Sequence, residues 1–190
     1  MLDYSQEELQ RLGADITTRE IYQQPEVWQE AFDSYKAQAA DIAAFLKKIE
    51  DKHDYIKVIF AGAGSSAYVG DTLMPYFRQM YDECKWNFNA IATTDIVANP
   101  LVHLKREVPT VLVSFARSGN SPESVATVDL AKQLVDDLYQ ITITCAAQGK
   151  LAQQAQDDEK NLLLLQPEAS NDAGFAMTSS FSSMMLTALL

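Results

Sequence analysis

The sequence predicts an α/β fold in which a parallel sheet is covered by helices on both faces. From residue 55 onward, short apolar runs alternate with longer segments of helical periodicity. The short runs are apolar on both faces, which is typical of parallel strands packed between two helical layers. The 190 residues are enough for one domain of ordinary size.

Residues 1–50 are predicted to form a helical segment ahead of the sheet. Ser5 and Glu8 match a capping box, and Gly13 is a suitable residue to end the helix that follows. A longer helix is expected to start near Pro25, because proline suits a first helical turn. Apolar residues then recur every three or four positions, so one face of this helix is expected to cover the sheet or a partner subunit.

Residues 51–190 are predicted to contain five strands and five helices. The predicted strands are Ile56–Ala61, Phe88–Ala92, Thr110–Phe115, Tyr139–Cys145 and Leu162–Gln166. The predicted helices are Ala67–Tyr81, a short piece around Asp95–Val97, Pro122–Asp136, Leu151–Gln156 and a final one from Thr178 to Leu190. The last helix stops inside an apolar pattern, which indicates a longer parent protein or an end that packs into another surface.

Composition and charge exclude several classes of protein. There is no apolar run of about 18 residues, so no transmembrane helix and no membrane partner are expected. The first residues lack the basic start and apolar stretch of a signal peptide, and two cysteines make no disulfide framework, so a cytoplasmic location is expected. A net charge of −11 without any Lys/Arg cluster argues against a nucleic-acid partner.

The most informative stretch is Ser114–Ser124, which reads S-F-A-R-S-G-N-S-P-E-S and follows the third predicted strand. Hydroxyls, backbone N–H groups and the start of a helix meet there, and such a combination favours a bound anion such as a phosphate. The candidate ligands in this loop are Arg117, Ser118, Gly119, Asn120 and Ser121. A capped turn without a ligand is the alternative for the loop, and Arg117 either adds charge to a pocket or faces solvent.

A second loop follows the first predicted strand, and it carries Gly64, Ser65 and Ser66. Ligands of doubly wound sheets bind at the carboxyl ends of the strands, so this loop and the previous one are expected to line one site. Gly62, Gly64 and Ala67 also match the dinucleotide fingerprint, which leaves a nicotinamide-dependent oxidoreductase as an alternative. That fingerprint needs an acidic residue about 20 positions further on, and Asp95 comes too late.

The loop before the last predicted helix carries Glu168 and Asp172, two candidates for acid–base chemistry. The alternative for both is solvation of the loop and capping of the helix. His53 and His103 lie outside all these loops and have no partners at metal-ligand spacing. We therefore expect no metal and no cofactor, and the sequence leaves the catalytic residue unknown.

Three segments resemble the signature loops of sugar isomerase (SIS) domains: Gly62–Tyr68, Ser114–Ser124 and Ala173–Phe181. More narrowly, they resemble the N-terminal SIS domain of the AgaS family, which comprises tagatose-6-phosphate ketose/aldose isomerases and galactosamine-6-phosphate deaminases. Arg19–Pro25 is also similar to the N-terminal segment of that family and of the isomerase half of glucosamine-6-phosphate synthase. The resemblance implies a flavodoxin-like sheet of five parallel strands that binds a phosphosugar.

The resemblance also implies roles for individual residues. The positions that match binding residues of the family are Gly64, Ser65, Ser66, Ser118 and Ser121. Ala116 and Arg117 depart from the pattern of glucosamine-6-phosphate synthase, whose phosphate loop has a serine and a glutamine there. Phe175 falls at a valine that lines the sugar, and Asp172 falls at a nearby glutamate.

The implied activity is aldose–ketose interconversion through an enediol, or through an enolamine with loss of ammonia in a deaminase. In the resembling enzymes, the catalytic glutamate and the ring-opening histidine sit in a second SIS domain, and the histidine comes from a neighbouring subunit. We therefore expect a second SIS domain after residues 51–190, a homo-oligomer, and little turnover by this chain alone. A phosphosugar-sensing regulatory module is the alternative, although residues 1–50 show no basic recognition helix.

Overall fold

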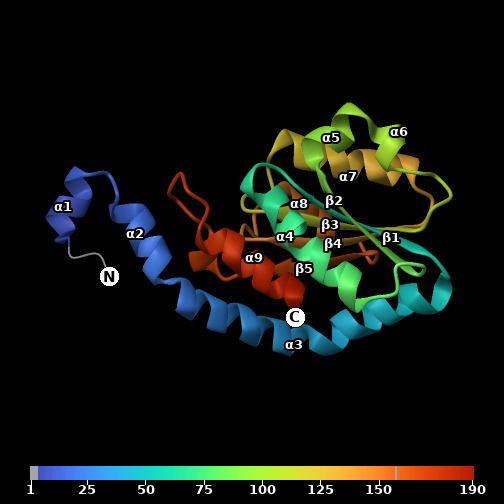
Figure 1. The fold of residues 1–190 in the computed structure, drawn as a ribbon, viewed down its shortest axis with the longest axis horizontal. Helices are drawn as coiled ribbons and strands as arrows, with labels where there is room; N and C mark the ends of the chain where they lie inside the picture. The colour runs from blue at the N-terminus through green and yellow to red at the C-terminus, as the bar shows by residue number, and fades with distance from the viewer. Residues whose placement is uncertain (1–3, 157) are drawn as a thin grey trace.

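A parallel sheet forms the centre of the structure (Figure 1). The computed structural model describes residues 4–156 and 158–190, and within them five strands pair in the order β2-β1-β3-β4-β5, all parallel. The strands are β1 (Ile56–Gly62), β2 (Trp86–Ala92), β3 (Thr110–Ala116), β4 (Leu138–Thr144) and β5 (Asn161–Leu165). The predicted flavodoxin-like fold is confirmed, and each strand begins and ends within two residues of its predicted range.

Helices precede the sheet and alternate with its strands. They are α1 (Gln6–Arg11), α2 (Asp15–Tyr22), α3 (Gln24–Lys52), α4 (Ser65–Met80), α5 (Thr93–Ala98), α6 (Pro100–His103), α7 (Pro122–Leu134), α8 (Lys150–Gln156) and α9 (Ser179–Leu189), with a 3₁₀ turn η1 (Glu168–Ser170). The sequence does not predict α6, whose last residue is His103. Pro100 begins this helix, because its fixed φ suits a first helical position.

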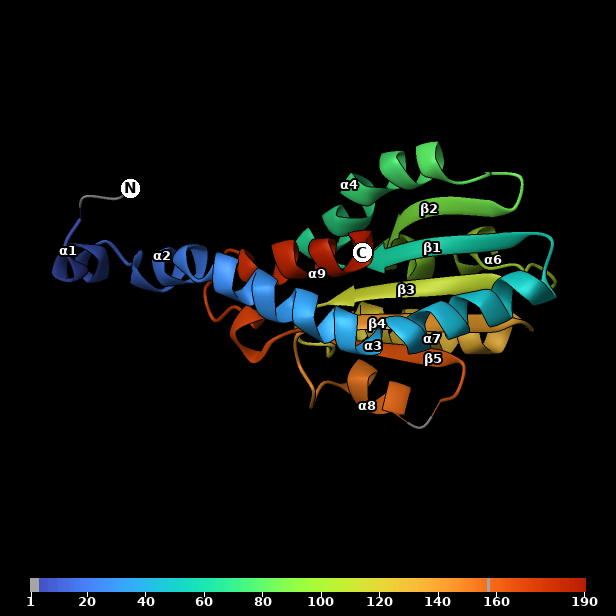
Figure 2. The same cartoon turned by 90° about the horizontal axis from the view of Figure 1, so that it is seen from below.

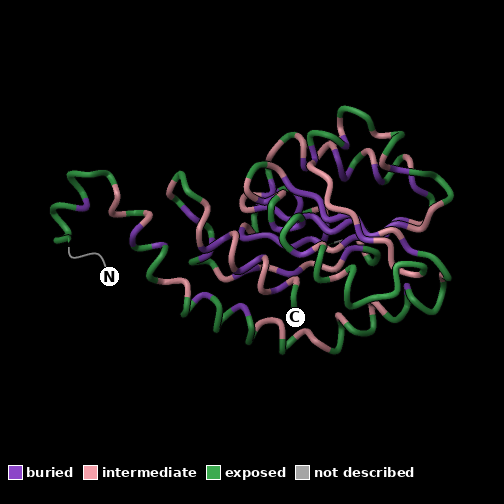
Figure 3. Tube along the Cα trace, in the orientation of Figure 1, coloured by how far each residue is buried: buried purple, intermediate pink, exposed green. Residues whose placement is uncertain are grey.

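The N-terminal arm, residues 4–23 with α1 and α2, extends away from the sheet. Helix α3 then runs along the domain and packs against α9 (Figures 1 and 2). The capping box of α1 is confirmed: Ser5 N donates to Glu8 Oε2 at 2.8 Å, and Glu8 N donates to Ser5 Oγ at 3.3 Å. Gly13 has φ +66° where α1 gives way to α2. Figure 3 shows that the arm is mostly exposed, whereas the strands are buried.

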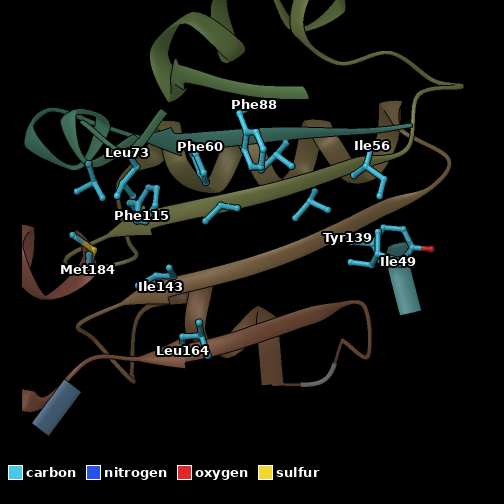
Figure 4. Close-up of a cluster of buried hydrophobic side chains, with 14 of the residues drawn as sticks. Ile49, Ile56, Phe60, Leu73, Phe88, Phe115, Tyr139, Ile143, Leu164 and Met184 are labelled. Carbon is cyan, nitrogen blue, oxygen red and sulfur yellow. The ribbon is translucent and has the colours of Figure 1, made fainter. Parts of the chain in front are cut away.

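Apolar side chains fill both faces of the sheet, and Figure 4 shows those on the face covered by α3, α4 and α9. Phe60 of β1 lies at the centre of this cluster. Its ring centroid is 5.4 Å from that of Phe77, 5.9 Å from that of Phe88 and 6.0 Å from that of Phe115. These contacts tie β1, β3 and α4 together, so the strand ends that carry the candidate loops stand on a packed core.

The strand order reverses between β1 and β3. After β1 the chain crosses to β2 on one side, and from β3 it proceeds to β4 and β5 on the other. Gly62 pairs with Phe115 in the register, so both strands end at the same level. The loops that follow them leave in opposite directions, and such a switch point is where open α/β sheets bind ligands. No helix in the described ranges is both long enough and apolar enough to span a bilayer.

Candidate functional site

The β1–α4 loop makes a tight turn directly into α4. A Cβ on Gly62 would overlap the backbone of Ser66 and Ala67, so only glycine fits there. Gly64 has φ +56°, a conformation that side chains disfavour. Ser65 is half-buried, Ser66 is buried, and the first turn of α4 contains no acidic residue. Gly64 offers no side-chain cap, so the positive end of α4 opens towards the switch point.

The β3–α7 loop brings a second helix start to the same edge of the sheet. Gly119 has φ +63°, and Ser121 is the N-cap residue of α7. Ser121 makes no side-chain capping bond; its hydroxyl instead donates to Ser124 Oγ at 2.7 Å. Ser118 Oγ accepts the backbone N–H of Asn120 at 3.3 Å, which leaves its hydroxyl proton for another acceptor. The loop thus keeps hydroxyl and backbone donors at an uncapped helix start.

The β4–α8 connection packs against this loop and makes hydrogen bonds with it. Asn120 Oδ1 accepts Lys150 N at 3.0 Å at the start of α8, so its side-chain oxygen is used internally. Leu151 N donates to the carbonyl of Gly119 at 3.1 Å. A Cβ on Gly149 would collide with the carbonyl of Ser118. These contacts fix the backbone of the β3–α7 loop, as preorganised binding of an anion requires.

Arg117 is half-buried, and its Nη1 donates to the carbonyl of Asp172. The guanidinium therefore connects the β3–α7 loop with the β5–α9 loop. Since one N–H bond uses only part of a guanidinium, Arg117 keeps further donors and its charge beside the switch point. The structure thus shows Arg117 as a link between two loops, an arrangement that neither of the sequence alternatives describes.

Asp172 is 2% exposed and caps α9 from the preceding loop. Its carboxylate accepts five hydrogen bonds, from Thr178 N and Oγ1, Ser179 N, and Ser180 N and Oγ, at 2.6–3.2 Å. Capping was the alternative to acid–base chemistry for this residue, and these contacts fit it. The five donors occupy both oxygens of the carboxylate, so Asp172 is committed to fixing the first turn of α9.

Glu168 and Phe175 lie in the same connection but face solvent. Glu168 is exposed in η1. Phe175 has a relative exposure of 104% at the tip of the β5–α9 loop. These exposed positions do not test the roles of Glu168 and Phe175, which stay predictions.

Cys145 lies at the carboxyl end of β4 and is buried. Burial raises the pKa of its thiol to about 11, while a hydrogen bond with Ser170 acts in the opposite direction. The thiol is therefore protonated at neutral pH and serves as a small core side chain.

The remaining polar groups with catalytic potential lie elsewhere. His53 follows α3 at the amino ends of the strands, with Nε2 3.3 Å from Tyr139 Oη and 4.0 Å from Asp137 Oδ2. In the described part of the chain, no three His, Cys, Asp or Glu side chains gather in a way that could hold a metal ion. An apolar cavity of about 450 Å³ lies between α3, α4 and the sheet, and its lining is unsuited to an anion.

Sequence reasoning missed one buried acid, Glu20 of α2. It is 3% exposed, and its Oε1 accepts the backbone N–H groups of Ala173 at 2.7 Å and Gly174 at 3.0 Å. A charged helix residue is ordinarily expected at the surface, so periodicity could not have found it. The only available signal was its place in the Arg19–Pro25 segment.

The fold, the two glycine loops and their helix starts agree with one family. A model of the SIS domain matches residues 49–190. The chain belongs to the SIS family. This SIS chain is 45% identical over 186 residues to the D-galactosamine-6-phosphate deaminase AgaS of Shewanella sp. (strain ANA-3), covering 98% of this chain and 48% of the relative.

Solved structures agree with this assignment. A Clostridium novyi NT protein, provisionally named as a tagatose-6-phosphate ketose/aldose isomerase, superposes with a TM-score of 0.91 at 45% identity, over 98% of this chain and 46% of that one. The tagatose-6-phosphate ketose/aldose isomerase from Escherichia coli gives a TM-score of 0.85 at 40% identity, over 90% and 46% of the two chains. The SIS chain described here spans about half the length of the relatives that it matches.

Proposed function

We propose that this SIS chain binds a phosphosugar in the crevice between the β1–α4 and β3–α7 loops. Two uncapped helix starts at the switch point of a SIS sheet support this site most directly. Ser118 donates its hydroxyl proton to the phosphate, together with the backbone N–H of Gly119. The Ser121 hydroxyl and the Asn120 N–H join them by exchanging Ser124 Oγ and Ser118 Oγ for the phosphate as acceptor. Arg117 adds positive charge from its position beside Asp172.

The sugar lies against the β1–α4 loop in this proposal. Gly64 lets the sugar approach the backbone closely, and the hydroxyls of Ser65 and Ser66 reach its polar groups. Phe175 covers the sugar from the β5–α9 loop, because a fully exposed aromatic ring is free to fold over a ligand. The Shewanella deaminase and the Escherichia coli isomerase are named for a hexosamine 6-phosphate and a hexose 6-phosphate. We propose the same substrate class here.

The reaction that we propose for the whole protein is aldose–ketose isomerisation or release of ammonia from an amino-sugar phosphate. Both need a base that moves a proton between the first two sugar carbons. Asp172 is saturated with hydrogen bonds and Glu168 is exposed, so neither is a good base. We propose that the base and the ring-opening group come from a second SIS domain, since the relatives are about twice as long, and that the protein is a homo-oligomer.

Calorimetry with galactosamine-6-phosphate tests the binding site. We expect saturable binding of galactosamine-6-phosphate, and weaker binding of inorganic phosphate and of galactosamine, which each lack part of the recognised group. Absence of phosphosugar binding would refute the site.

Ammonia release and isomerisation assays on the 190 residues and on the full-length protein test the location of the base. Turnover is expected only for the full-length protein, and robust turnover by the 190 residues would place the base inside this chain. Light scattering on the full-length protein gives its subunit number, and a monomer would contradict the proposed homo-oligomer.

A further inference from the structure

Glu20 joins the N-terminal arm to the β5–α9 loop. Its Oε1 holds two consecutive backbone N–H groups, those of Ala173 and Gly174. Its Oε2 is buried and has no hydrogen-bond partner among the described residues. One carboxylate oxygen therefore makes all the directed contacts, and these contacts orient the peptide units immediately before Phe175.

The fit around Glu20 is close on the loop side. A Cβ on Gly174 would come 2.7 Å from Glu20 Oε2 and 3.0 Å from Thr17 Oγ1. A side chain at position 174 would therefore displace the Glu20 carboxylate or the loop from its present position. The absence of a side chain at Gly174 lets the carboxylate lie directly against the loop backbone.

A separate set of bonds attaches the arm to the base of the same loop. Gln23 Nε2 donates to the carbonyl of Ala169 at 2.7 Å and to Ser179 Oγ at 3.1 Å. Ser179 Oγ also donates to the carbonyl of Glu20 at 2.8 Å. Attachment of the arm therefore does not depend on the Glu20 side chain alone.

The orientation set by Glu20 passes directly to the β3–α7 loop. Ala173 follows Asp172, whose carboxylate is fixed on α9 and whose carbonyl accepts the guanidinium of Arg117. Arg117 precedes Ser118, the first hydroxyl of the candidate phosphate loop. Only short backbone steps separate these bonds, so a shift at position 173 moves the acceptor that holds Arg117.

We propose that Glu20 is a positioning residue for the phosphosugar site, through its grip on Ala173 and Gly174. It sets where Phe175 meets the sugar and keeps the Asp172 carbonyl in place for Arg117. This inference rests on the proposed function, because it assigns a role towards that same ligand.

The test compares Glu20→Leu, Glu20→Gln and Gln23→Leu. Glu20→Leu removes the acceptor and should weaken galactosamine-6-phosphate binding about ten-fold, while inorganic phosphate binding changes less. Glu20→Gln keeps an acceptor for both N–H groups and loses only the unpartnered oxygen, so it should bind within about two-fold of the parent. Gln23→Leu breaks the other attachment of the arm, so it should lower the melting temperature with little change in affinity.

The outcomes separate positioning from a purely structural role. If affinity falls for both leucine variants in proportion to their melting temperatures, Glu20 only attaches the arm and the inference fails. Equal affinities for Glu20→Leu and the parent would overturn it as well. Should Glu20→Leu not fold, Gly174→Ala perturbs the same contact from the loop side, and unchanged binding by a folded Gly174→Ala protein would contradict the inference. If the parent itself binds no phosphosugar, the proposed function has failed first.

Discussion

Replacing Asp172 by Asn changes one oxygen of a buried carboxylate into a donor that faces other donors. Depending on how the amide is oriented, either the two donors on Oδ1 or the three donors on Oδ2 lose their acceptor. The variant also removes the negative charge from the N-terminus of α9. The substitution keeps the size of the side chain, so packing changes contribute little to the result.

The expected loss of stability follows from these contacts. A hydrogen bond to a charged group contributes about 1.5–3 kcal/mol, but donors that share an acceptor do not add independently. We therefore expect Asp172→Asn to lower the free energy of unfolding by about 3–5 kcal/mol, because at least two buried donors lose their acceptor. In urea, this loss corresponds to a midpoint lower by about 1–2 M.

Urea unfolding followed by circular dichroism measures this difference, and Asp136→Asn is the matched control. Asp136 pairs with Arg106 at 3.0 Å, but both side chains are more than 60% exposed, so its loss should cost at most about 1 kcal/mol. If Asp172→Asn changes the midpoint no more than Asp136→Asn does, the cap on α9 contributes little.

Three further predictions concern binding, reactivity and pH. Ser118→Ala should weaken phosphosugar binding by about 1–3 kcal/mol in calorimetry, through one lost charge-assisted bond, and unchanged affinity would remove Ser118 from the site. At pH 8 a thiol reagent should modify exposed Cys84 but not Cys145, whose pKa burial raises to about 11, until the chain unfolds; fast modification of both in the native state would contradict this. A hydrogen bond from Lys52 holds the pKa of Asp137 below its usual value, so Asp137 contributes stability above the ordinary aspartate pKa of about 3.9 and loses it as the pH falls through its lower folded pKa. The stability difference between the parent and Asp137→Asn should therefore shrink below about pH 4, and a constant difference would refute the linkage.

The sequence predicts the strands well because each is a short apolar run between polar turns. It also indicates the two glycine loops, because each has a glycine between a predicted strand and a predicted helix. In the structure, Gly64 and Gly119 both take positive φ at these turns. Helix α6 escapes prediction because four residues carry no periodicity. The link from Arg117 to Asp172 is equally hidden, because it joins positions that only the fold brings together.

The uncapped starts of α4 and α7 have a kinetic consequence for the proposed ligand. Helix dipoles act over about one turn, whereas the net charge of −11 acts over the Debye length, about 8 Å at physiological ionic strength. A phosphosugar is therefore repelled on approach and attracted only on arrival. Added salt should screen the repulsion first, so the association rate constant should rise with ionic strength before competing anions slow binding.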